Sequence, residues 1–155
     1  MTQCMLLAVD GSQGGDRALE YSIAQVKDRG IKLVVAYVIE WSPYSFNTPE
    51  ENAERHKRRE GEISRAKKTI IDPAMEKLAG HNIKTESIVR HGAPVETLNE
   101  LAKKHDVDQI VIGRRGQSGI KSLLFGSVAG SLIQTSEVPI TVVPLYPLGS
   151  SQVQS

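Results

Sequence analysis

Four residues between positions 113 and 127 have the types and spacing that could hold a phosphate group. Gly113, Gly116, Gly126 and Ser127 follow a short apolar run, and the next helix is expected to begin at Ser127. Glycine lets the backbone approach an anion closely, and a helix start adds unpaired N–H donors and a partial positive charge. The same residues could simply turn a surface loop with Ser127 as helix cap, so the residues alone leave both interpretations open.

Asp10 is the carboxylate best placed to meet the same ligand. It follows the first apolar run of the chain, within the segment 9–12. Its side chain could hold a ribose hydroxyl, bind Mg²⁺ through water, or cap the turn before the next helix. We interpret Asp10 as a ligand contact. Hydrolysis also needs a positioned base or metal-bound nucleophile, and we assign no catalytic residue and no metal-binding side chain. His91 follows the third apolar run and could approach the ligand, but we interpret it as an exposed loop residue.

Three better-known phosphate motifs are absent from the sequence. A Walker loop needs Gly-Lys-Ser/Thr, where this chain has Ile120, Lys121 and Ser122. The first turn lacks the GxGxxG spacing of dinucleotide-binding domains, although Glu40 could imitate their ribose-binding acid. No His-Ile-Gly-His sequence occurs. These absences argue against a P-loop NTPase, a nicotinamide cofactor and adenylyl transfer.

The elements that must position these residues alternate between strand and helix. Five apolar runs rich in β-branched residues predict strands at 4–9, 33–39, 83–89, 109–112 and 140–143. Segments of helical period separate them, which favours a parallel sheet with helices on both faces. The sequence therefore predicts a single doubly wound α/β sheet of order 3-2-1-4-5. In that order the loops after the first and fourth strands face one crevice, so Asp10 and Gly113 should be neighbours.

Length and composition limit the remaining possibilities. The 155 residues predict one domain over 1–145, followed by a flexible polar tail at 146–155. Alternating charges at 51–68 are typical of a solvated helix, and Pro73 either kinks that helix or restarts it with Asp72 as a cap.

The charge balance and the apolar runs argue against a nucleic-acid partner and against a membrane span. The 19 basic residues nearly cancel the 18 acidic ones, which predicts no nucleic-acid partner. No apolar run is long enough to span a bilayer, and the amino terminus lacks the pattern of a signal peptide. With a single cysteine, Cys4, these features favour a cytoplasmic protein.

The long glycine spacing resembles the universal stress protein family. Its ATP-binding members carry G-2x-G-9x-G-[S/T] after the fourth strand and an aspartate after the first. In this chain Gly113, Gly116, Gly126 and Ser127 fall on every fixed position. The resemblance spans residues 4–144 and includes the segments 9–12 and 138–143. Arg114 departs from it, because the family often has a small hydroxyl residue there.

The resemblance implies a bound adenine nucleotide, ATP or its AMP or ADP form, with Mg²⁺ or Mn²⁺ held through the phosphates. It implies ribose near Asp10 and Gly113, phosphates near the helix start, and adenine against Val38. The complete set of expected nucleotide contacts is Ala8, Asp10, Val38, Ile112, Gly113, Arg115, Gly116, Gly126, Ser127 and Val128.

The resulting hypothesis is an ATP-binding stress-response protein that acts as a nucleotide-sensing homodimeric module and is at most a weak ATPase. Members of the family commonly dimerise through the last strand, and the apolar edge at 138–143 invites such pairing unless the tail covers it. Two alternatives remain: a slow ATP hydrolase or phosphotransferase using the same site, and an interaction module of the same fold that binds no nucleotide.

Overall fold

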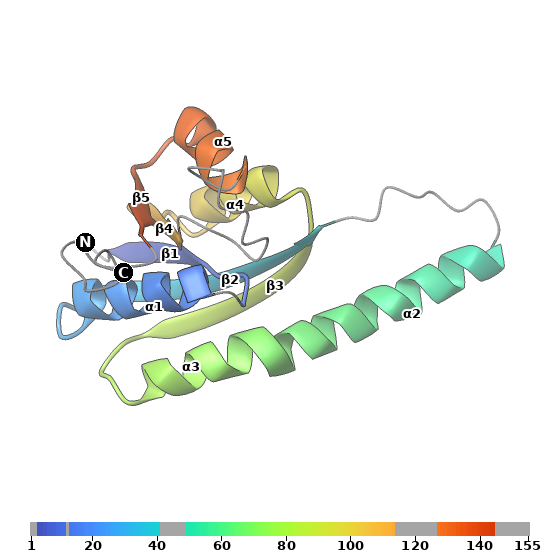
Figure 1. Cartoon of the computed structure of the whole chain (residues 1–155), viewed down its shortest axis with the longest axis horizontal. Coiled ribbons are helices and arrows are strands. Elements are labelled where there is room, and N and C mark those ends of the chain that lie inside the picture. The colour runs from blue at the N-terminus through green and yellow to red at the C-terminus, as the bar shows by residue number, and fades with distance from the viewer. Residues whose placement is uncertain (1–2, 12, 41–48, 114–126, 145–155) are drawn as a thin grey trace, which may run out of the picture.

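A five-stranded parallel sheet forms the centre of the chain in the computed structural model, which describes residues 3–11, 13–40, 49–113 and 127–144 (Figure 1). The strands are β1 (Cys4–Ala8), β2 (Lys32–Glu40), β3 (Thr85–Gly92), β4 (Gln109–Gly113) and β5 (Ile140–Val143). Every pairing is parallel and the order is β3-β2-β1-β4-β5. This confirms the predicted doubly wound sheet of order 3-2-1-4-5.

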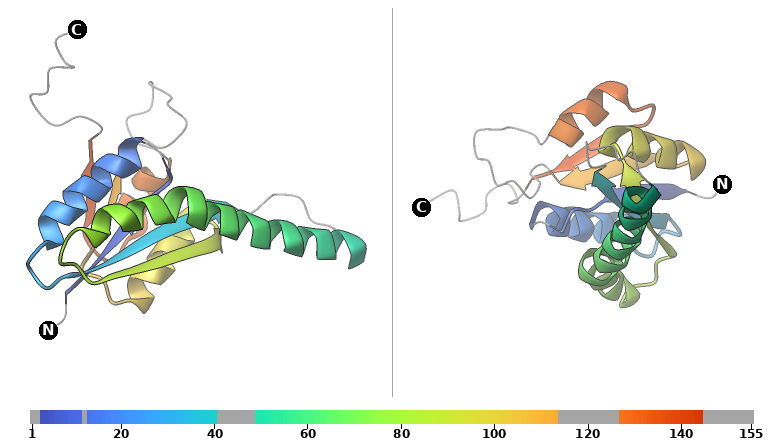
Figure 2. Two further views of the ribbon diagram at one scale, coloured as in Figure 1. Left: turned by 90° about the horizontal axis from the view of Figure 1, so that it is seen from below. Right: turned by 90° about the vertical axis from the view of Figure 1, so that its right-hand side faces the viewer.

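Helices cover both faces of this sheet, as the near-continuous apolar strands predicted (Figures 1 and 2). One face packs against α1 (Gln13–Val26) and α3 (Asp72–Ala79), with Leu7, Leu19 and Leu78 almost completely buried between them. The other face packs against α4 (Pro94–Lys104) and α5 (Ser127–Thr135), with Leu6, Leu101 and Leu132 in its core. Among the described residues, no helix has the length and apolar character to cross a membrane.

The third strand differs from its predicted bounds of 83–89. It begins two residues later, at Thr85, and continues to Gly92, so it includes the polar pair Arg90 and His91. Main-chain pairing with the long strand β2 runs through to Gly92, opposite Glu40. An edge strand can carry polar residues because the helices cover its side chains less completely, and most residues of β3 are only half-buried. Its main-chain pairing does not depend on hydropathy, so an apolar pattern underestimates its length.

The helix around Pro73 is continuous. The helix α2 (Pro49–Ala66) runs through a π-helical turn, η1 (Lys67–Ile71), into α3. The N–H of Asp72 donates to the carbonyl of Lys67, five residues earlier, in place of the usual four. Proline has no N–H and its ring clashes with the carbonyl four residues before it, so a wider turn accommodates it. A restart with Asp72 as cap is wrong, because the residue before α3 is helical and no side chain caps it.

Candidate functional site

A cavity of about 440 Å³ opens at the carboxyl ends of β1, β2 and β4, where the winding of the sheet reverses. This is the position at which doubly wound sheets bind ligands. The described residues that line it are Ala8, Val9, Asp10, Ala36, Tyr37, Val38, Glu40, Pro94, Leu98, Ile112 and Val128.

Two small side chains on adjacent strands create the space. Ala8 of β1 and Ala36 of β2 are direct partners in the parallel register. Side chains alternate between faces along a strand, so both alanines share a face with Leu6 and Val34, two residues earlier. There the larger side chains fill the interior and are completely buried. The core therefore ends at Ala8 and Ala36, and the missing side-chain volume leaves an opening beyond them.

The helix α4 supplies one wall of the cavity through Pro94 and Leu98. It begins directly after β3, because Ala93 has an extended backbone and Pro94 is preset for the first helical turn. Leu98 is 3 % exposed and packs with the strands β1 and β2 in the same core cluster. On the other side Val128, in the first turn of α5, and Ile112 of β4 complete an apolar wall.

Asp10 and Glu40 are the charged groups of the described lining, which contains no basic side chain. The Tyr37 hydroxyl has a raised pKa, first because of burial and then because the carboxylates of Asp10 and Glu62 are near. This part of the cavity suits an apolar ring and a group that donates hydrogen bonds to a carboxylate. Any phosphate would need donors from elsewhere, such as the start of α5 or the segment 114–126, which lies outside the described residues.

Half of the predicted nucleotide contacts line this cavity: Ala8, Asp10, Val38, Ile112 and Val128. Gly113 ends β4 and Ser127 begins α5, as expected, but neither belongs to the described lining. Arg115, Gly116 and Gly126 lie outside the described residues, as does the predicted tail at 146–155. The roles of all ten residues in binding remain predictions.

Sequence reasoning missed Val9, Ala36, Tyr37, Pro94 and Leu98. It considered Glu40 only as part of a nicotinamide site. The alternation of side chains could have revealed Ala36, since it is a small residue near the end of the second strand, level with Ala8. The wall from α4 depends on how the helix packs across the sheet, which no local pattern in the sequence encodes.

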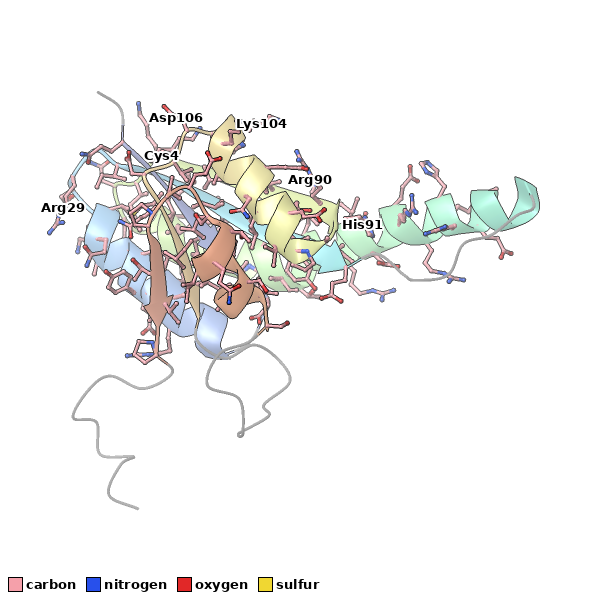
Figure 3. All side chains as sticks on the ribbon, turned by 90° about the horizontal axis from the view of Figure 1, so that it is seen from above. Cys4, Arg29, Arg90, His91, Lys104 and Asp106 are labelled. Atoms are coloured by element: carbon pink, nitrogen blue, oxygen red, sulfur yellow. The ribbon has the colours of Figure 1, made fainter. Side chains whose placement is uncertain are left out.

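His91 lies in β3, and its expected position in an exposed loop is wrong. Its side chain is 8 % exposed, and its Nε2 lies 3.2 Å from Oε2 of Glu62 in α2. Figure 3 shows His91 where the sheet meets α2, at the end of the body opposite Cys4 and Lys104. This contact connects the long helix to the cavity end of the sheet. Within the described parts of the chain, no three His, Cys, Asp or Glu residues form a group suited to a metal.

The strand order defines a doubly wound α/β domain, with a cavity at the point where such domains bind ligands. Residues 1–144 match the universal stress protein family, and the chain belongs to this family. It is 28 % identical over 146 residues to universal stress protein YxiE of Bacillus subtilis, an alignment that covers 90 % of this chain and 97 % of the relative.

Solved structures of the same family share the fold. UspA of Lactobacillus plantarum has a TM-score of 0.79 at 20 % identity, over 91 % of this chain and 97 % of that one. A universal stress protein in complex with cAMP has a TM-score of 0.61 at 25 % identity, over 94 % and 98 %. The Archaeoglobus fulgidus protein in complex with dAMP also has a TM-score of 0.61, at 20 % identity over 92 % and 98 %.

Proposed function

We propose that this chain binds an adenine nucleotide, ATP in the first place, and acts as a nucleotide-sensing regulatory module in stress response. The observation that carries the proposal is the cavity beside Ala8 and Ala36 at the reversal point of the sheet. Similar folds in the family hold cAMP and dAMP, both adenine nucleotides. An adenine ring would lie between the apolar side chains of Val38, Leu98 and Ile112.

The ribose would lie near Asp10 and Gly113, with its hydroxyls donating to the Asp10 carboxylate. Phosphates would lie at the other side, near Arg115, Gly116, Gly126, Ser127 and Val128, away from Asp10 and Glu40. The start of α5 supports this direction, because a helix N-terminus offers N–H donors and a partial positive charge. Mg²⁺ or Mn²⁺ would be held mainly through the phosphates and water, since the described lining supplies only two carboxylates.

The chemistry of the described lining supports regulation over catalysis in this proposal. The described lining offers phosphate chemistry no positioned base beyond Asp10 and Glu40, and Asp10 is already assigned to ribose. Sustained phosphate release that Asp10→Ala abolishes without loss of binding would instead establish a slow hydrolase. Absence of adenine-nucleotide binding by this chain would instead favour the second alternative, an interaction module of the same fold.

The dimer would form through β5, which is the outermost strand of the sheet beside β4. An unpaired edge presents main-chain donors and acceptors to a second copy. Light scattering after gel filtration should give about twice the chain mass of 17.0 kDa. In this proposal residues 1–145 form the cytoplasmic binding unit and 146–155 its tail.

The decisive experiment is mass spectrometry of small molecules released from the purified, denatured protein, followed by melting in ATP, AMP and Mg²⁺. Nucleotide at 100 times its Kd should add about 2.7 kcal/mol to the free energy of unfolding. Gly116→Val and Gly126→Val should abolish this shift in a folded protein, because a Cβ would intrude where backbone meets phosphate.

Gly80→Val is the matched control for those variants, since Gly80 ends α3 and no atom lies within 4 Å of an added Cβ. The control should keep the full nucleotide shift. Absence of any shift in the unmodified protein with all the adenine nucleotides would refute the proposed function.

A further inference from the structure

The near-neutral charge of the chain conceals a strongly basic segment on the long helix. Residues 55–68 contain seven basic and two acidic side chains, which leaves twelve basic and sixteen acidic residues in the rest of the sequence. Most of this segment belongs to α2, which extends well beyond the end of the sheet (Figures 1 and 2). The prediction of no nucleic-acid partner used the near-neutral total, and the interpretation of 51–68 as a segment of alternating charges overlooked the excess of cations within 55–68.

Four of the cations form one exposed face, which we call the basic stripe: Lys57, Arg58, Arg65 and Lys68. Arg58, Arg65 and Lys68 lie one, eight and eleven positions after Lys57, which places all four within about 100° of one another around the helix, so the stripe is continuous. It extends over about 16 Å at 1.5 Å per residue. Arg55, Arg59 and Ala66 follow the same spacing on the opposite, less exposed side.

The two acidic residues of the segment are engaged elsewhere. Glu60 lies 3.0 Å from His56 on a flank of the helix, and Glu62 contacts His91 of β3. Within the described part of the chain, no ion pair involves a residue of the basic stripe. The stripe therefore presents its positive charge directly to solvent.

Gly61 lies in the middle of the stripe, and no contact among the described residues explains it. It is exposed in a helix interior, where glycine is destabilising, and no atom lies within 4 Å of an added Cβ. With Ser64 it leaves the helix backbone open between the two pairs of cations. A partner can therefore approach the helix axis closely while four cations surround the contact.

We propose that the basic stripe binds the phosphate backbone of a nucleic-acid duplex without reading its sequence. An α-helix fits the major groove, and the basic stripe lies on the exposed side of the helix, away from the side on which Glu62 contacts the sheet. Residues 49–79 contain no Phe, Tyr or Trp on which single-stranded bases could stack. The exposed part of α2 also lacks the apolar face that insertion into a membrane surface requires.

Fluorescence anisotropy of a labelled duplex of about 20 base pairs tests the proposal, with the full chain and saturating ATP present. The ATP prevents the duplex ends from entering the nucleotide cavity. For four phosphate contacts, affinity should fall about 100-fold between 50 and 200 mM salt. Duplexes of unrelated sequence should bind equally within about threefold, because phosphate contacts carry no sequence information.

Two variants of equal charge separate the stripe from total charge. The stripe variant is Lys57→Ala, Arg58→Ala, Arg65→Ala and Lys68→Ala, and it should lower duplex affinity at least about tenfold and flatten the salt dependence. The control removes four exposed cations elsewhere, Lys27→Ala, Arg29→Ala, Lys84→Ala and Lys103→Ala, and should remain within about threefold of the unmodified chain.

A third variant, Gly61→Leu, keeps the charge and the helix but fills the gap in the stripe. It should weaken duplex binding several-fold, and an unchanged affinity would refute close approach at this glycine. No duplex binding at 50 mM salt, or equal losses in the stripe variant and its control, would overturn the proposal. So would stripe-dependent binding of phosphatidylserine vesicles or of a second copy in place of the duplex. Affinity for ATP, measured separately, tests the nucleotide cavity alone.

Discussion

Replacing Ala36 by leucine should block the cavity beside Ala8 and Ala36, where we propose that the nucleotide binds, and should leave the fold intact. Ala36 is 1 % exposed, and the next position toward the carboxyl end on its face opens into the cavity. The longer side chain would occupy the place proposed for adenine. A ring that buries about 100 Å² of apolar surface gains about 2.5 kcal/mol, so its displacement should raise the Kd about 60-fold. Because the added atoms enter open space, unfolding should change by less than the 1–3 kcal/mol typical of overpacking.

Isothermal titration calorimetry with ATP measures the Kd, and urea denaturation measures stability in the same preparations. Ala102→Leu is the matched control, since Ala102 is also buried on this face of the sheet but lines a separate groove of about 360 Å³ between α4 and the end of α5. The control should keep the affinity of the unmodified chain. An Ala36→Leu protein that is folded and binds ATP within threefold of that affinity would refute the assignment of adenine to this cavity.

Three further predictions concern stability and reactivity. Gly61→Ala should raise the midpoint of thermal unfolding, equivalent to about 0.5–1 kcal/mol, because Gly61 is exposed in a helix and has room for a Cβ; a lower midpoint would contradict this. The Lys32 ammonium lies 2.8 Å from the Glu86 carboxylate and holds the pKa of that carboxyl below its usual 4.5. The pair therefore stabilises the fold fully above pH 4.5, and the effect is lost as the pH falls through the lowered pKa. Glu86→Gln should therefore cost about 0.2–1 kcal/mol in urea denaturation at pH 7 and progressively less as the pH falls through the lowered pKa, whereas a loss that does not shrink on acidification would point to another cause. Burial raises the pKa of the Cys4 thiol, so a disulfide reagent at pH 8 should label it only as fast as the protein opens, and immediate labelling of the native chain would refute its burial.

The sheet could be predicted from the sequence because its inner strands are buried on both faces. Runs such as Leu33 to Val35 then consist of apolar residues at every position, and all three are completely buried. The edge strand β3 was less predictable, since Glu86, Arg90 and His91 interrupt its apolar pattern while the main chain continues to pair. The π turn before Pro73 could not be predicted either, because the local sequence is compatible with both a kink and a restart.

The candidate site likewise contains residues that could be predicted from the sequence and residues that could not. Asp10 could be placed because the ends of neighbouring parallel strands must meet at the reversal point. Val38 and Val128, which also line the cavity, were expected there only from the resemblance to the family. Leu98 and the contact between His91 and Glu62 could not be placed, because they depend on how helices far away in the sequence pack across the sheet. Local spacing identifies loops, whereas tertiary packing decides which side chains enclose a cavity.

The cavity and the basic stripe share one physical feature: in both places a small residue stands where the molecule has room for a larger side chain. At Ala8 and Ala36, larger residues would extend the core that Leu6 and Val34 begin, so their small size costs buried apolar surface. At Gly61, alanine would strengthen an exposed helix without meeting any atom. In both places a larger residue would make the fold more stable, and the surroundings led to the proposed ligand. These surroundings are apolar walls beside a carboxylate for the nucleotide, and cations along a helix for the duplex. The described lining of the cavity and the basic stripe share no residue, so each can be removed and measured without the other.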